Sequence, residues 1–206
     1  PGRPDLSPHL IHFTKASGSF DALATLLKII GEKTLRGSNG FVKGGSTCIS
    51  FTEAPFELLS EGLANPQGDT RYSGFGLRFS KAHIFQLGGR PVIYQPDNEY
   101  LALPPALRWR HVRFEPLADP PIDWTWEREW RLPLQELTFT DKEIEVVVPD
   151  DAAAERFVRE IEHETHYNCM QWEVVLGRIA WMYYEPSPWR VLRSKGAPDS
   201  AHGLFE

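Results

Sequence analysis

The chain has 206 residues, with 22 Lys and Arg against 28 Asp and Glu, so its formal net charge is −6. This length is enough for one domain with a sizeable core. The acidic balance argues against a protein that coats nucleic acid, because such proteins carry a strong basic excess. The sequence has no run of about 18 apolar residues, so we expect no membrane-spanning helix.

The two cysteines, Cys48 and Cys169, are far apart and belong to no Cys-x-x-Cys pair. We interpret them as free thiols in a reducing cytoplasm, which excludes a disulfide framework and a zinc knuckle. The sequence also contains no repeat and no linker between two cores. We therefore expect one cytoplasmic domain over residues 1–206, with loose ends at 1–8 and 195–206.

Apolar side chains recur at helical spacing over residues 20–30, where Ser19 is a suitable N-cap and Gly31 a suitable end. Further helices are predicted at 52–63, 80–87 and 152–162.

Short apolar runs bounded by Gly and Pro predict the strands. They fall at 10–14, 48–51, 76–79, 91–94, 110–114, 129–132, 143–148, 178–184 and 189–192, with a glycine-rich loop at 37–46. Strands outnumber helices, and the helices cluster early and late. We therefore expect an α+β fold with a mostly antiparallel sheet.

His12 and Thr14 lie two residues apart on the first predicted strand and would face the same side of it. Together they can offer several hydrogen bonds to a ribose or a carboxamide. The alternative interpretation is a core histidine with satisfied hydrogen bonds beside a threonine that favours a strand.

The segment 124–131, Trp-Thr-Trp-Glu-Arg-Glu-Trp-Arg, is rich in tryptophan and charge. If it is extended throughout, alternation puts three tryptophans and Arg128 on one face, and Glu127, Glu129 and Arg131 on the other. Aromatic side chains beside a carboxylate are typical of nucleotide or sugar sites. The alternative is an exposed charged strand whose tryptophans pack inward.

Two further motifs are weaker. In Tyr72–Gly76 small residues would let the backbone approach a ligand while Tyr72 stacks on it, but the glycine spacing of a dinucleotide-binding loop is missing. The segment His163–His166 does not meet His-Glu-x-x-His. We interpret it as a solvated helix end and expect no metal site.

Taken in order, five segments resemble bacterial abortive-infection proteins of the AbiGi type. Those proteins are in turn similar to the ADP-ribosyltransferase-like group that includes the DNA-modifying toxin DarT. The likeness runs over about residues 10–150. Its segments are Ile11–Thr14, Cys48–Pro55, Tyr72–Lys81, Gly88–Tyr94 and Glu127–Arg131.

The resemblance implies an ADP-ribosyltransferase-like fold, in which two small sheets and flanking helices surround a cleft that holds NAD. It implies that His12 anchors the NAD ribose and that Thr14 assists at the nicotinamide side. Tyr72, or alternatively Phe75, would stack on the nicotinamide.

The same resemblance implies that Glu129 is the catalytic glutamate, with Glu127 as the alternative. A fixed carboxylate suits this chemistry, because positive charge develops on the ribose when its bond to nicotinamide breaks. Donors for the pyrophosphate would come from Arg78, Lys81 or the loop 37–45.

One departure concerns the substrate. DNA-modifying relatives have an arginine soon after the second strand, but the stretch 52–56 has none. Arg71 and Arg78 are the alternatives. The resemblance thus implies transfer of ADP-ribose to a macromolecular acceptor, nucleic acid or protein, in phage defence or in a toxin system with an antitoxin partner.

Two other functions stay open from the sequence. One is a catalytically inactive domain of the same fold that binds a nucleotide or a partner. The other is a metal-independent ribonuclease toxin with His12 and Glu129 as its acid and base, against which the net charge of −6 counts.

Overall fold

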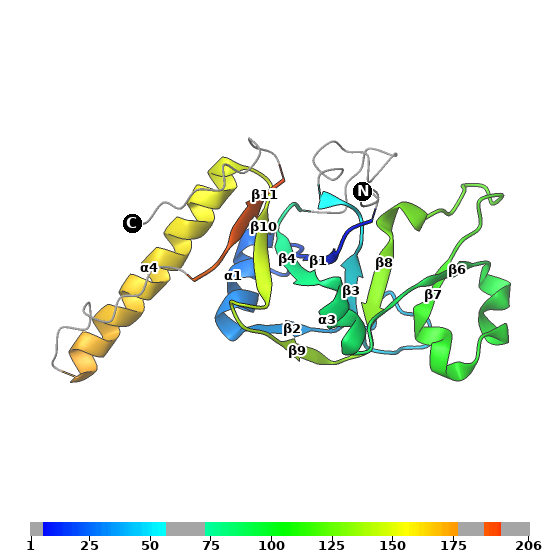
Figure 1. The fold of residues 1–206 in the computed structure, drawn as a ribbon, viewed down its shortest axis with the longest axis horizontal. Helices are drawn as coiled ribbons and strands as arrows, with labels where there is room; N and C mark the ends of the chain where they lie inside the picture. Colours follow the sequence, from blue (N-terminus) through cyan, green and yellow to red (C-terminus); the bar gives the residue numbers. More distant parts are fainter. Residues whose placement is uncertain (1–5, 57–72, 177–187, 195–206) are drawn as a thin grey trace.

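The computed structural model describes residues 6–56, 73–176 and 188–194. Its centre is a seven-stranded sheet (Figure 1). The strand order is β11-β10-β4-β1-β3-β8-β5, and every neighbouring pair is antiparallel except β10 and β11. The strands are β1 (His9–Phe13), β3 (Ile49–Thr52), β4 (Gly76–Ser80), β5 (Arg90–Pro91), β8 (Glu129–Leu132), β10 (Ile144–Val148) and β11 (Val191–Arg193).

Two smaller strand pairs flank this sheet. β2 (Thr34–Arg36) and β9 (Glu136–Thr138) are antiparallel, whereas β6 (Ile93–Gln95) and β7 (His111–Arg113) are parallel. The predicted α+β class and the mostly antiparallel sheet are confirmed. The predicted single strand over 91–94 is divided between β5 and β6, and the sequence did not predict β2 or β9.

The resemblance implied two small sheets, whereas the structure has one seven-stranded sheet. The difference depends on how β1 pairs with β3. These strands pair at one position, Ile11 opposite Thr52. By contrast, β1 pairs with β4 along all five of its residues. The sheet is therefore continuous, but it is held together at its middle by a single residue pair.

The helices are α1 (Ala22–Glu32), α3 (Lys81–Gln86) and α4 (Asp151–Leu176), with 3-10 turns η1 (Asp97–Ala102), η2 (Pro105–Arg110) and η3 (Thr125–Glu127). α1 begins after Asp21, whose carboxylate accepts a hydrogen bond from Ala24 N, and it ends at Lys33 in the left-handed conformation. The sequence had predicted Ser19 and Gly31 for these roles. Ser80 caps α3 as predicted.

α4 continues to Leu176, beyond the predicted end at residue 162. Its far end extends past the sheet (Figure 1). The predicted strand 178–184, most of the predicted helix 52–63, residues 1–5 of the loose N-terminal end and the loose C-terminal end 195–206 lie outside the described residues. Among the residues described, no helix has the length and apolar character needed to cross a membrane.

The core lies between the sheet and the two longer helices. Fully buried side chains come from β1, β4, β8 and β10, and they meet apolar side chains of α1 and α4. These side chains include Leu10, Leu77, Phe79, Leu132, Val146, Leu23, Leu26 and Phe157. Gly76 lets β1 and β4 approach closely, since a Cβ there would lie 2.5 Å from His12 O.

Candidate active site

A cleft of about 930 Å³ opens where β1 and β3 part. Beyond the single pair Ile11–Thr52, the two strands make no further pairing, so the end of β1 and the start of β3 form its inner wall. α1 and the loop after β2 contribute another side, and η3 and β8 complete it. The cleft brings together four of the side chains that the sequence singled out: His12, Thr14, Glu127 and Glu129.

A chain of hydrogen bonds joins His12 to Glu129 through Ser50. His12 Nδ1 lies 2.8 Å from Ser50 O, and Ser50 Oγ donates to Glu129 Oε1 at 2.8 Å. A carbonyl oxygen can only accept, so Nδ1 carries the proton and Nε2 keeps a lone pair. Burial lowers the pKa of His12, with Ser50 O opposing the shift and Lys15 adding to it. The imidazole is therefore a neutral acceptor at neutral pH.

Arg131 holds the Glu129 carboxylate from the other side. Its Nε donates to Oε1 at 2.9 Å and its Nη2 to Oε2 at 3.2 Å, a two-pronged arrangement. Arg131 Nη1 donates to the carbonyls of Trp109 and His111 at 2.8 and 3.0 Å. The Arg131 side chain is only 4% exposed. Glu129 is thus a preoriented anion on the cleft wall.

Residues 124–131 do not meet the condition of being extended throughout, on which the alternation of their side chains depended, although the predicted strand 129–132 forms as β8. Residues 125–127 form η3, and Arg128 adopts the left-handed conformation with φ 43° before β8 begins at Glu129. These residues are not extended, so alternation does not hold. As a result Trp124 lines the cleft together with Glu127 and Glu129, instead of facing away from them.

Trp130, another of the three tryptophans that the strand pattern placed, packs in the core. Its Nε1 donates to Glu53 Oε2 at 2.7 Å. Glu53 also pairs with Lys81 at 2.7 Å. Lys81 is therefore engaged outside the cleft and does not reach it.

Three other predicted residues do not present a free group to the cleft. Thr14 lines the cleft, but its hydroxyl hydrogen is directed to Ala22 O and Phe75 O. Phe75 packs against the core, and neither Phe75 nor Arg78 is among the cleft residues. Arg78 pairs with Glu145 of β10 at 2.6 Å. Tyr72 lies outside the described residues.

Sequence reasoning missed two lysines of the cleft, Lys15 and Lys28. Each lies over an aromatic ring: Lys15 Nζ is 5.6 Å from the Phe41 centroid, and Lys28 Nζ is 5.9 Å from that of Phe20. In the described part of the chain neither lysine has an ion-pair partner, whereas the other exposed cations of the cleft are paired: Arg36 with Glu32, Lys43 with Asp97, and Arg113 with Glu115. The one sequence signal that could have indicated Lys15 is its position directly after His12-Phe13-Thr14.

Cys48 is buried at the wall of the cleft. Burial raises the pKa of its thiol. Of the smaller effects, the charge of Arg131 lowers this pKa and the charge of Glu129 raises it. The thiol is therefore protonated at neutral pH and is a poor nucleophile. Within the ranges that the structure describes, no group of three or more His, Cys, Asp or Glu side chains is arranged to hold a metal ion.

In comparisons with protein-family models, with curated proteins and with solved structures, the chain has no significant match. Its function is therefore argued from the cleft itself.

Proposed function

We propose that the chain is an NAD-dependent ADP-ribosyltransferase whose active site is this cleft. The observation that carries the proposal is the convergence of His12 and Glu129, joined through Ser50, at the point where β1 and β3 separate. A neutral hydrogen-bond acceptor and a fixed carboxylate both line the cleft there. The cleft volume of about 930 Å³ lies at the upper end of the range that holds small-molecule ligands.

Glu129 would act as an electrostatic stabiliser. When the bond between the ribose carbon and the nicotinamide nitrogen breaks, its electron pair goes to nicotinamide and positive charge develops on the ribose. A carboxylate already oriented by Arg131 and Ser50 can face that charge without reorganising. The acceptor then forms a bond to the same ribose carbon and loses a proton.

His12 would position the ribose. Its Nε2 lone pair can accept a hydrogen bond from a ribose hydroxyl, and the bond from Nδ1 to Ser50 O fixes the ring. Thr14 would contribute indirectly, because its bonds to Ala22 O and Phe75 O tie the end of β1 to its neighbours.

The two unpaired lysines supply the charge that a pyrophosphate needs. Lys15 and Lys28 face the same cleft as Glu129, and they replace Arg78 and Lys81 as the candidates for phosphate contacts. The aromatic side chains Phe20, Phe41 and Trp124 also line the cleft and offer flat surfaces for the two ring systems of NAD. Stacking by Tyr72 stays a prediction.

The resemblance described above extends this proposal to the cellular setting. It favours a macromolecular acceptor, either nucleic acid or protein, and a role in bacterial phage defence or in a cytoplasmic toxin system with an antitoxin.

The test is release of nicotinamide from NAD by the purified protein mixed with DNA, RNA or cell lysate. Glu129→Gln should lower turnover by at least about 100-fold, the effect of removing one preorganised electrostatic group. Glu145→Gln is the matched control, because Glu145 also pairs with a half-buried arginine in the same sheet but lies outside the cleft. Full turnover by Glu129→Gln would overturn the assignment.

The same assay separates the alternatives. If NAD raises the melting temperature of the protein but is not cleaved with any acceptor, the protein is a nucleotide-binding domain and not an enzyme. RNA cleavage in buffer without NAD would indicate a ribonuclease. The geometry favours a fixed electrostatic role for Glu129, because Arg131 and Ser50 hold both of its oxygens in place.

A further inference from the structure

Two arginines are anchored to the backbone at β5 and in the turn before it, outside the cleft. Arg90 belongs to β5, and its Nη1 donates to Phe85 O at 2.9 Å and to Gly89 O at 2.7 Å. Arg110, at the end of η2, donates from Nε to Pro91 O at 2.9 Å. Both side chains are half-buried. The backbone carbonyls of Phe85, Gly89 and Pro91 therefore anchor both guanidinium groups.

The turn before β5 is built to place Arg90. Gly88 has φ +101°, a conformation that side-chain-bearing residues rarely adopt. A Cβ on Gly89 would lie 2.5 Å from Ile84 Cγ2 and 2.8 Å from Ile84 O. The two glycines let the chain turn tightly against α3, so that the Arg90 guanidinium stacks on the Phe85 ring at 3.9 Å. The Arg90 guanidinium is therefore held in place by the protein alone.

The charge of these arginines is not neutralised by the described parts of the protein. Seven other described arginines form ion pairs with carboxylates: Arg36, Arg78, Arg113, Arg131, Arg156, Arg190 and Arg193. Among the described residues, no carboxylate pairs with Arg90 or Arg110, although the chain is acidic overall. Burial and the nearby Arg90 charge lower the pKa of Arg110. Both arginines are held on the backbone of residues 85–91, and no carboxylate of the described residues balances their charge.

We propose that Arg90 and Arg110 form a binding site for a phosphate group. Arg90 keeps its Nε and Nη2 hydrogens, and Arg110 keeps both of its Nη groups, after their bonds to carbonyls are counted. A guanidinium edge with two parallel N–H groups matches two oxygens of a phosphate. An oxyanion between the two arginines would also relieve their mutual repulsion.

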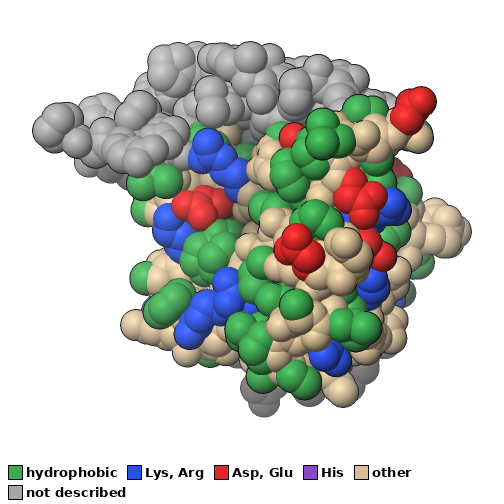
Figure 2. Space-filling view, turned by 90° about the vertical axis from the view of Figure 1, so that its right-hand side faces the viewer, with side chains coloured by type: hydrophobic (Ala, Val, Ile, Leu, Met, Phe, Trp, Pro, Cys, Tyr) green, Lys and Arg blue, Asp and Glu red, His purple; other side chains and the backbone are tan. Residues whose placement is uncertain are grey.

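This site is separate from the cleft, and the inference does not rest on the proposed function, since neither arginine lines the cleft. It belongs to the end of the molecule that carries β6, β7, η1 and η2. Figure 2 shows that face, where Lys and Arg side chains lie among hydrophobic ones and do not form one continuous basic field. A small, localised anion suits such a surface.

The test follows the arginine side chains directly. In the full-length protein labelled with ¹⁵N, the Nε–H signals of Arg90 and Arg110 are identified by their loss in Arg90→Gln and Arg110→Gln. Inorganic phosphate, titrated at constant ionic strength against chloride, should shift both signals in the wild type with one common saturation curve. Because this readout uses the wild type, it holds even if a variant folds poorly.

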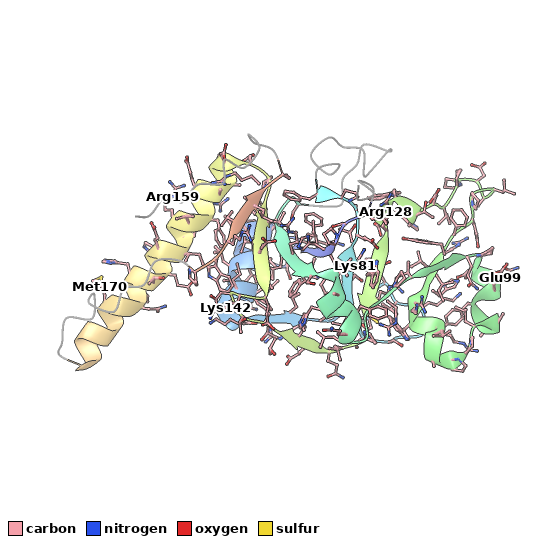
Figure 3. All side chains as sticks on the ribbon, in the orientation of Figure 1. Lys81, Glu99, Arg128, Lys142, Arg159 and Met170 are labelled. Atoms are coloured by element: carbon pink, nitrogen blue, oxygen red, sulfur yellow. The ribbon has the colours of Figure 1, made fainter. Side chains whose placement is uncertain are left out.

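A matched control is Arg159→Gln on α4, on the opposite side of the molecule from Glu99 of η1 (Figure 3). Arg159 is exposed, and its substitution by Gln removes the same single positive charge as the other two substitutions. Arg90→Gln and Arg110→Gln should each weaken phosphate affinity about tenfold, as expected for one lost charge-assisted hydrogen bond. Arg159→Gln should leave it unchanged.

Two results would overturn the phosphate site. One is that phosphate shifts neither arginine signal; the other is that it shifts the Arg159 signal equally and without saturation. A parallel titration with a dinucleotide identifies the source of the phosphate. Tighter binding of inorganic phosphate indicates a free or terminal phosphate, whereas tighter binding of the dinucleotide indicates an internal phosphodiester.

Discussion

Two arginine–glutamate pairs lie in the same sheet, and they differ in what surrounds them. Arg131 and Glu129 are 4% and 13% exposed, and Glu129 stands on the wall of a large cleft. Arg78 and Glu145 are 17% and 15% exposed, and they bridge β4 and β10 outside that cleft. The charge chemistry is the same, but only one pair faces a space that a ligand can enter.

The comparison shows that an ion pair by itself does not identify a site. Glu145 is satisfied by Arg78 on one oxygen and by the exposed Arg190 on the other, so it ties strands together. Glu129 is also satisfied, by Arg131 and Ser50, but Ser50 leads on to His12. What distinguishes the two regions is the parting of β1 from β3, which leaves this polar chain facing a cleft.

The largest expected effect on stability comes from Arg131. Arg131→Met should lower the free energy of unfolding by on the order of 3–5 kcal/mol, because it leaves Glu129 buried without its partner. The measurement is urea unfolding. Adding Glu129→Leu to this variant should restore most of the loss, since the uncompensated charge is then gone. A double variant as unstable as the single one would show that packing, not charge, is responsible.

The second pair should behave differently. Glu145→Gln should cost about 1–3 kcal/mol of stability through weakened charge-assisted hydrogen bonds to Arg78 and Arg190, and it should leave nicotinamide release unchanged. Stability is followed by urea unfolding and turnover by the NAD assay. If turnover fell as far as in Glu129→Gln, the distinction between the two pairs would be lost.

A smaller effect is expected at Arg128, the left-handed residue that turns the chain between Glu127 and Glu129. Arg128→Val should lower the free energy of unfolding by about 1–2 kcal/mol, because a β-branched residue is strained in this conformation. Arg128→Gly is the control and should cost less, since glycine adopts the conformation without strain. Equal losses in the two variants would mean that the arginine side chain, not the backbone, matters there.

The smallest effect concerns the pH dependence contributed by His12. Burial, with a smaller contribution from Lys15, lowers the pKa of His12 in the folded state below its ordinary value of 6.5. The unfolded chain therefore binds a proton that the folded chain resists. Stability should fall as the pH drops below about 6.5 and should level off below the folded pKa.

His12→Asn tests this prediction, because asparagine keeps a donor for Ser50 O but does not titrate. The difference in unfolding free energy between pH 7.5 and pH 5.5, measured by urea unfolding, should be smaller in the variant. An identical pH dependence in the two proteins would assign the effect to other groups.

Local patterns predicted most of the elements. The strands around His12, Cys48, Gly76 and Ile144 and the helix capped by Ser80 were all predicted, because period-two apolar runs and helix caps are local signals. The pattern over 124–131 misled, since alternation cannot reveal a left-handed residue such as Arg128 in the middle of a run. β2 and β9 are three residues long, which is too short for a periodic signal.

The candidate site was predicted in part. His12, Glu127 and Glu129, which the sequence singled out, all line the cleft. Arg78 lies outside the cleft and pairs with Glu145, a partner 67 residues away in the sequence that no local pattern reveals. Ser50, Lys15 and Lys28 were missed because a serine or a lysine in a strand or loop is common and carries no pattern of its own.

The sequence by itself determined the α+β class, most strands, the acidic balance and the residues with suitable chemistry, since these depend on composition and on neighbours a few positions apart. Only the tertiary structure decided which of those residues share a cleft. That depends on where β1 stops pairing with β3, and pairing between distant segments is set by long-range packing that no local pattern encodes. The same parting of strands made Glu129 a candidate for catalysis and left Glu145 as a link within the sheet.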